Sequence, residues 1–180
     1  MKVGLSVTAP SSLPAQSMIL GVNHIGIVPV DMSKARWFFG EILGLLDLGE
    51  ANVEQQMVHS YTFSVPFRKS LRTLHPDENL VNCRLEVQEN LGQTGYLERF
   101  LAKRGGGIHH LAFTVRNIGG CLAYLRSSGV EIISPKPTVG VHGHLIAFID
   151  PKSTGGILVE LVEELPFYEA QTHQENHVEG

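Results

Sequence analysis

Two stretches of the chain begin in the same way, and this internal repeat limits the possible folds more than any other feature. Residues 23–28 read Asn-His-Ile-Gly-Ile-Val, and residues 109–114 read His-His-Leu-Ala-Phe-Thr. Each stretch is a short apolar run led by a histidine, and each is followed by a helix-like segment and further strand-like runs. Two such modules paired about a pseudo-twofold axis would bring His24 and His110 together.

The repeat extends into the segments that follow the histidines. The shift of 86 residues that carries His24 onto His110 also carries Asp31 onto Asn117 and Phe38 onto Tyr124. Asp and Asn are preferred N-cap residues, so both positions are expected to begin a helix. The repeat therefore predicts a helix after the first strand of each module.

Two glutamates occupy equivalent places on the last strand expected in each module. Glu86 lies in the run 84–87 (Arg-Leu-Glu-Val) and Glu160 in the run 158–161 (Leu-Val-Glu-Leu). Their separation of 74 residues is shorter than that of the histidines by about the extra length of the loop expected in the first module. A carboxylate in an apolar strand is costly to bury unless something pairs with it. Two carboxylates and two histidines at equivalent points indicate a shared cation.

The apolar pattern predicts an α+β fold of paired βαβββ modules. Residues 1–18 are expected to form a disordered leader, 19–104 the first module with a linking helix, 105–165 the second module, and 166–180 a polar tail. A long loop is expected over residues 66–79. The expected strands are 20–30, 45–50, 57–65, 80–87, 108–115, 130–133, 145–149 and 157–162, and the expected helices follow Asp31 or Ser33, cover 94–103, and run from Asn117 to Ser128.

The composition excludes several classes of partner. The chain is 43% apolar and 18% charged with a net charge of −4, as in an ordinary soluble globular protein, and it lacks the basic stripe of a nucleic-acid-binding protein. No apolar run approaches the ~18–20 residues that a membrane span needs. Cys83 and Cys121 are too few for a disulfide framework and are expected to be buried free thiols. The reducing cytoplasm is the expected location.

Each candidate ligand also has an ordinary interpretation. A strand histidine is commonly a hydrogen-bonded core residue, and a strand glutamate commonly faces solvent. His109 and His110 are expected to point to opposite faces of one strand, and the repeat selects His110. Taken together, the four residues favour a metal site. Two imidazoles and two carboxylates suit Co, Mn, Ni, Zn or Fe(II) with open positions, and the lack of thiolates argues against a closed structural zinc site.

Three stretches carry a resemblance to a known superfamily. They are residues 23–27, residues 100–113 (Phe-Leu-Ala-Lys-Arg-Gly-Gly-Gly-Ile-His-His-Leu-Ala-Phe) and residues 151–161 (Pro-Lys-Ser-Thr-Gly-Gly-Ile-Leu-Val-Glu-Leu). Over about residues 20–164 the chain resembles the vicinal oxygen chelate superfamily (glyoxalases, bleomycin resistance proteins and dioxygenases), and within it the methylmalonyl-CoA epimerases most closely. The resemblance implies a cupped mixed β-sheet, a homodimer, and a divalent metal ion with four ligands. These ligands are His24, Glu86, His110 and Glu160.

The same resemblance implies an isomerase that removes and returns the α-proton of an acyl-CoA such as methylmalonyl-CoA. Glu160 is the family-type candidate for proton transfer on one side of the substrate. Many similar epimerases carry a glutamate on the third strand as a proposed base, and the matching position here is expected to be His59. Imidazole suits that work because its unperturbed pKa of ~6.5 lies near operating pH. The alternative for His59 is a histidine that only hydrogen-bonds Tyr61 or the substrate.

Two other functions stay open on the sequence. One is a different metal-dependent enzyme of the same superfamily, either a glyoxalase-type lyase or an epimerase of a secondary-metabolite or sugar ketone, because the same ligand set serves these reactions. The other is a non-catalytic small-molecule-binding protein of the same fold. A small-molecule substrate is expected in both enzyme readings, with neither nucleic acid nor membrane as a partner.

Overall fold

The computed structural model describes residues 18–65, 83–92 and 95–165, and its strands form one eight-stranded mixed sheet. The strand order is β2-β3-β4-β1-β5-β8-β7-β6. In chain order the elements are β1 (Ile19–Val28), α1 (Met32–Arg36), the π-helical turn η1 (Trp37–Ile42), β2 (Leu46–Val53), the 3-10 turn η2 (Glu54–Gln56), β3 (Val58–Ser64), β4 (Arg84–Asn90), α3 (Tyr96–Arg104), β5 (Gly107–Val115), α4 (Ile118–Ser127), β6 (Thr138–Val139), the 3-10 turn η3 (Val141–Gly143), β7 (Leu145–Ile149), η4 (Pro151–Ser153) and β8 (Val159–Glu163).

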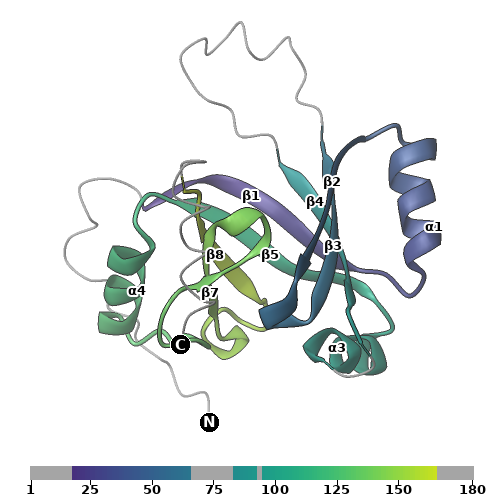
Figure 1. Ribbon diagram of the computed structural model, residues 1–180. Helices are drawn as coiled ribbons and strands as arrows, with labels where there is room; N and C mark the ends of the chain where they lie inside the picture. The colour runs from purple at the N-terminus through teal and green to yellow at the C-terminus, as the bar shows by residue number, and fades with distance from the viewer. Residues whose placement is uncertain (1–17, 66–82, 93–94, 166–180) are drawn as a thin grey trace, which may run out of the picture.

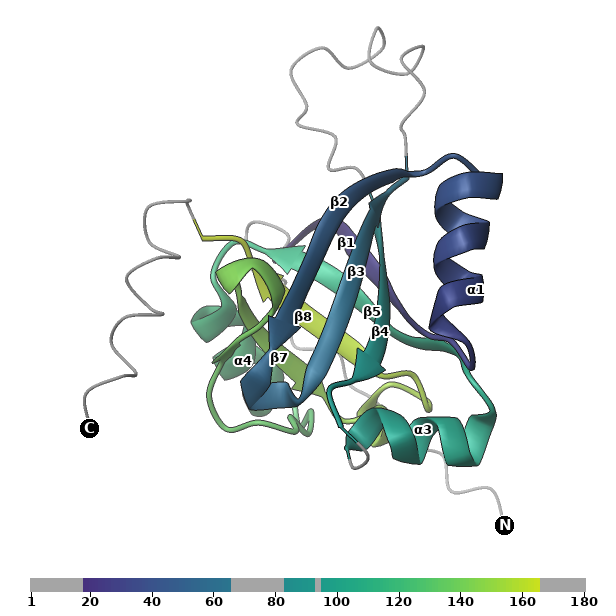
Figure 2. The same cartoon turned by 45° about the vertical axis from the view of Figure 1, so that its right-hand side comes forward.

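The two halves meet at the centre of the sheet. β1 and β5 pair antiparallel there, and each has a parallel neighbour on its other side, β4 for β1 and β8 for β5. Reading outward from the centre, both halves therefore run through their first, fourth, third and second strands. The sheet is strongly curved, α1 and α4 lie on its outer side, and α3 lies across one end of the cup (Figures 1 and 2). This arrangement places β1, β4, β5 and β8 along the floor of the cup.

The helices of the two halves begin in the same way. The side-chain oxygen of Asp31 accepts a hydrogen bond from the Lys34 backbone N–H at 2.9 Å, and that of Asn117 accepts one from the Gly120 backbone N–H at 2.8 Å. Each cap satisfies one of the N–H groups that the first turn of a helix leaves without an intrahelical partner. The caps lie at the positions that the repeat aligns.

Apolar side chains fix α4 to the outer face of the sheet and α3 to the end of the cup where β1 ends and β3 begins. The buried residues of α4 are Ile118, Cys121 and Leu122, and they pack in one cluster with Leu161 of β8. Leu97 of α3 is fully buried and packs in a second cluster. Cys121 is buried and Cys83 is half-buried, and neither forms a disulfide within the described part of the chain.

Within the described residues, the expected elements agree with the structure except in two places; the starts of the expected strand 80–87 and of the expected helix 94–103 lie outside them. Residues 130–133 do not form a strand: they make a single bridge, Ile132 to Ile149, and a two-residue strand β6 follows. Pro135 and Pro137 limit the pairing to this short stretch, because proline cannot donate to a strand ladder and both lie between the bridge and β6. The first helix also changes to π-helical geometry from Trp37 onward.

Some expectations cannot be compared with the structure. The predicted leader, the 66–79 loop and the 166–180 tail lie outside the described residues, apart from Met18. None of the helices in the described part of the chain has the length and apolar composition that a membrane span requires.

Candidate metal centre

A β-bulge precedes each of the two repeated histidines. Between β1 and β5, Val22 pairs with Phe113 and His24 with Ala112, so Asn23 is an extra residue on β1. In the same way His109 is an extra residue on β5, between His110 and Ile108. A bulge breaks the alternation of side chains and re-aims them. Each histidine therefore has a neighbouring polar side chain beside its own ring.

Two imidazoles and a carboxylate converge on the inner face of the sheet. The Nε2 atoms of His24 and His110 are 2.9 Å apart, and Oε2 of Glu160 lies 3.2 Å from the first and 3.0 Å from the second. The three side chains are buried, and one ligand atom from each lies within 4.8 Å of the others. Two imidazole lone pairs and a carboxylate facing one another require a proton or a cation among them.

Asn23 fixes the ring of His24. Its Oδ1 lies 2.9 Å from Nδ1 of His24 and accepts a further hydrogen bond from Nη2 of Arg84 at 2.9 Å. Its Nδ2 donates to Oγ1 of Thr114 and to Glu164, both at 2.9 Å. Because an amide oxygen only accepts, Nδ1 of His24 carries the proton and Nε2 presents its lone pair to the site.

His109 makes the equivalent contact to His110. The two Nδ1 atoms are 3.0 Å apart, and the ring of His109 packs against Tyr96 and Phe100. Burial first, and then the neighbouring His110, lower the pKa of His109 to about 4. A neutral His109 can accept the Nδ1–H of His110, which leaves Nε2 of His110 free. The expectation that the two rings point to opposite faces is wrong here, because the bulge breaks the alternation.

The charges of the cluster stabilise one another. Burial alone would raise the pKa of Glu160, but the hydrogen bonds from His110 and His24 outweigh it and lower the pKa to about 2. Burial likewise opposes the charged form of His24, and the carboxylates of Glu86 and Glu160 overcome it and raise its pKa. The cluster therefore favours positive charge between the ring nitrogens and the carboxylates, which is the condition for holding a cation.

Glu86 lies beside this group on β4. It is buried, its Oε1 is 3.5 Å from Nδ1 of His24, and its Oε2 accepts a hydrogen bond from Nε2 of Gln88 at 3.2 Å. Its contact is thus with Nδ1 of His24 rather than with the three converging atoms. Glu86, His24, His110 and Glu160 all line one pocket on the inner face of the sheet. The structure brings all four predicted residues into one pocket.

A glycine makes room for one of the rings. Gly26 pairs with His110 across the β1–β5 ladder, and a Cβ at Gly26 would lie 2.0 Å from Cε1 of the His110 ring. Ala112 stands at the equivalent place opposite His24, and its side chain is buried there. The two histidines are therefore accommodated differently by the strand that each one faces.

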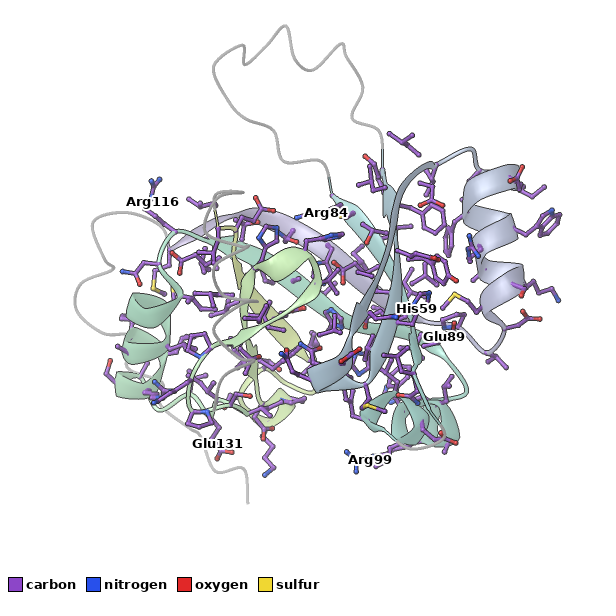
Figure 3. The ribbon with its side chains drawn as sticks, viewed as in Figure 1. His59, Arg84, Glu89, Arg99, Arg116 and Glu131 are labelled. Carbon is purple, nitrogen blue, oxygen red and sulfur yellow. The ribbon has the colours of Figure 1, made fainter. Side chains whose placement is uncertain are left out.

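His59 lies on the other face of β3. Its ring contacts Asn52 and Tyr61, its Nε2 is 3.6 Å from Oε2 of Glu50, and it lies near Glu89 in Figure 3. The side chains of β3 alternate, and Ser60 and Thr62 are the buried polar residues of the opposite face. The helical segment α1–η1 covers the face that carries His59, since Arg36 stacks on Tyr61 at 3.9 Å. The structure does not bring His59 to the pocket.

Sequence reasoning did not identify the histidines of the loop between β6 and β7. His142 and His144 both line the pocket, and burial lowers the pKa of each. Nε2 of His142 is 3.3 Å from Oγ1 of Thr62 on β3. The available signal was two of the nine histidines in one glycine-containing segment, residues 140–144 (Gly-Val-His-Gly-His). A loop has no periodicity to show which way a side chain points.

Comparison with known proteins identifies the family. The model of the Glyoxalase/Bleomycin resistance protein/Dioxygenase superfamily matches residues 23–148. The chain belongs to this superfamily. Among relatives, it is 40% identical to the mitochondrial methylmalonyl-CoA epimerase of Dictyostelium discoideum over 79% of the chain and 78% of the relative. It is 36% identical to the ethylmalonyl-CoA/methylmalonyl-CoA epimerase of Cereibacter sphaeroides over 80% of the chain and 98% of the relative.

Solved structures of this superfamily show the same fold. The crystal structure of methylmalonyl-CoA epimerase from Mycobacterium tuberculosis has a TM-score of 0.75 and 28% identity, and the match covers 88% of this chain and 97% of that one. A methylmalonyl-CoA epimerase in complex with methylmalonyl-CoA and NH4+ has a TM-score of 0.72 at 25% identity, with 83% and 97% covered. These matches confirm the predicted superfamily, the predicted fold and the prediction of an epimerase-like isomerase.

Proposed function

We propose that the protein epimerises a 2-substituted malonyl-CoA thioester, such as methylmalonyl-CoA, at its acidic α-carbon with the help of a divalent metal ion. The observation that carries the proposal is the convergence of His24, His110 and Glu160, all buried, with both Nε2 atoms close to one another and to Oε2 of Glu160. The names of the relatives supply the substrate class, since the curated epimerases act on methylmalonyl-CoA or ethylmalonyl-CoA.

The residues of the pocket suit such an ion. His24, His110 and Glu160 would hold it, and Glu86 is the proposed fourth ligand because it is buried in the same pocket. Nitrogen and carboxylate ligands suit Co, Mn, Ni, Zn or Fe(II). The partners of the two Nδ1 atoms, Asn23 and His109, would hold both rings in the orientation that ligation needs.

The reaction follows from the acidity of the α-carbon. A bound divalent cation would polarise the thioester carbonyl and offset the negative charge that develops as the α-proton leaves. Glu160 is ionised, as its lowered pKa of about 2 requires, and is the proposed group that takes or returns the proton on one side. The carbon becomes planar in the enolate, so return of a proton to the other side inverts the centre.

Exchange of the α-hydrogen with solvent tests this function. Purified protein loaded with Co(II) or Mn(II) is expected to exchange the C2 hydrogen of methylmalonyl-CoA for deuterium in D2O and to interconvert the two epimers. Glu160→Gln should abolish both, and His59→Ala is the matched control because His59 lies on the outer face of β3. Absence of exchange in the metal-loaded wild type would contradict the proposal.

A glyoxalase-type lyase is the second candidate. The observation that favours it is the cluster of His24 and His110 with two buried carboxylates, Glu86 and Glu160, beside a β3 strand whose buried polar groups are hydroxyls. The same preparation should then turn over the hemithioacetal of methylglyoxal and glutathione and leave methylmalonyl-CoA unchanged. Metal-free protein that binds a small molecule without turnover would support the binding-protein alternative.

The assembly and location are proposed on separate grounds. We propose a homodimer, as the family resemblance implies, and exposed apolar side chains on α1–η1 and β2 support it. The members of this exposed group are Trp37, Phe38, Ile42, Leu43, Leu46 and Leu48. The free thiols of Cys83 and Cys121 support the reducing cytoplasm as its location.

A further inference from the structure

Epimerisation needs proton transfer on both faces of the planar carbon, and Glu160 serves only one of them. The inner face of β3 offers Ser60 and Thr62 as its buried polar side chains, and an alcohol is too weak an acid and too weak a base to serve as a general acid or base near neutral pH. His59 faces away from the pocket. The second group must therefore come from another element.

The loop between β6 and β7 brings an imidazole into the pocket from the second half of the chain. His142 lines the pocket together with His24 and Glu86, and its Nε2 reaches Oγ1 of Thr62 at 3.3 Å. It also borders an adjoining cleft of about 320 Å³ between residues 51–55 and residues 139–143. His142 is thus placed where a molecule in the cleft would extend toward the cluster.

The backbone of His142 is held in an uncommon conformation. Its φ of 61° and ψ of 16° are left-handed, and among the described non-glycine residues only Met57 shares a positive φ. Such a conformation is sterically unfavourable for a residue with a Cβ and persists when its surroundings impose it. Gly140 is closely packed here, since a Cβ on it would lie 2.7 Å from Ile146. The loop therefore holds this imidazole in a defined position.

We infer that His142 is the second acid–base residue of the epimerisation, acting on the face of the substrate opposite Glu160. This inference rests on the proposed function. His142 contacts Thr62 on β3, whereas Glu160 lies on β8, and three strands, β4, β1 and β5, stand between β3 and β8 in the sheet. The two groups thus line the same pocket from opposite sides of β1, the strand that carries His24.

The proton balance is simple. In one direction the Glu160 carboxylate takes the C2 proton, the C–H electron pair passes into the enolate, and the imidazolium of His142 delivers a proton to the opposite face. The reverse direction starts from neutral His142 and protonated Glu160. Burial lowers the pKa of His142, with Arg84 and His24 adding to this effect and Glu86 opposing it. Exchange of protons with water then returns both groups to their starting states.

The left-handed backbone suggests two variants that keep the loop intact. Glycine adopts this conformation without strain, so His142→Gly removes the ring and leaves an imidazole-sized space. Asparagine also tolerates it, so His142→Asn keeps a polar group near Thr62 that cannot transfer protons near pH 7. Both variants are expected to keep the metal content and circular dichroism of the wild type.

The test follows each epimer of methylmalonyl-CoA separately in D2O. Both variants should interconvert the epimers at least about 100-fold more slowly than wild type. One epimer should still exchange its C2 hydrogen through Glu160 without inversion, and the other should not. Free imidazole should restore interconversion in His142→Gly but not in His142→Asn. His59→Ala should behave as wild type and show no response to imidazole.

Two results would overturn the inference. One is interconversion at the wild-type rate in His142→Gly or His142→Asn. The other is equal residual exchange of both epimers with no response to imidazole in His142→Gly. Failure of the proposed function would look different, because the wild type itself would then exchange neither epimer.

Discussion

Each half of the molecule supplies one imidazole to the pocket, but the residue that holds this imidazole differs between the halves. In the first half, the bulged Asn23 accepts the Nδ1–H of His24, and in the second half the bulged His109 faces Nδ1 of His110. Asn23 is part of a polar network with Arg84, Thr114 and Glu164. His109 instead stands against the rings of Tyr96 and Phe100.

The two contacts have similar geometry, but their acceptors respond differently to pH. An amide oxygen accepts a hydrogen bond at any pH, whereas an imidazole accepts only while it is neutral. The apolar surroundings of His109 keep it neutral by lowering its pKa to about 4. The halves are thus expected to contribute equally to metal binding at neutral pH and to differ in acid.

The largest expected effect tests whether the two halves contribute equally to metal binding. His24→Ala and His110→Ala should each weaken metal binding by more than about 100-fold and abolish turnover, because each removes one of two converging nitrogens. Metal content after dialysis and C2 exchange measure the effect. Full metal occupancy in either variant would show that only one half supplies a ligand.

The bulged residues should have a smaller effect. Asn23→Ala and His109→Leu remove the acceptor of one Nδ1–H each and should weaken metal binding by about 10–100-fold. His109→Asn keeps an acceptor and should lose less than His109→Leu. Calorimetric titration with Mn(II) or Zn(II) gives the affinities. Equal losses in His109→Asn and His109→Leu would mean that the ring, and not its acceptor, is what matters.

The response to acid distinguishes the halves further. The pKa of His109 is about 4 in the folded protein and ~6.5 in the unfolded chain, so the unfolded chain takes up its proton first as the pH falls. Above pH ~6.5, His109 therefore does not change the free energy of unfolding of the metal-free protein. As the pH falls to ~4, it lowers that free energy by about 2 kcal/mol. Urea unfolding of metal-free wild type and His109→Asn should diverge in this window. Parallel pH profiles would contradict the neutral state of His109.

The helix caps provide the smallest test. Asp31→Ala and Asn117→Ala each remove one side-chain acceptor from the first turn of α1 or α4 and should each lower the free energy of unfolding by about 1 kcal/mol. Denaturant titration at pH 7 measures both. Metal affinity should stay unchanged in both variants, and a change in either would link that helix to the site.

The repeat in the sequence predicted the fold and the meeting of His24, His110 and Glu160, because equivalent strands of two modules occupy equivalent places in a sheet. The sequence could not show which face of β3 borders the pocket. Alternation along β3 shows that His59 and Thr62 lie on opposite faces, but not which face the helical segment α1–η1 covers.

Local backbone irregularities explain the remaining differences. The bulge at His109 moves a ring that regular alternation would place on the other face. The left-handed backbone of His142 lies in a loop, where hydrophobic periodicity carries no information. These features depend on contacts between segments far apart in the chain, so a single sequence does not display them.

Gly26 and Ala112 show that the two halves are no longer interchangeable. They are equivalent under the shift of 86 residues that joins His24 to His110, yet only Gly26 leaves the space that the opposing ring fills. His24 instead faces the methyl group of Ala112. Any side chain at position 26 would therefore displace the imidazole that the other half supplies.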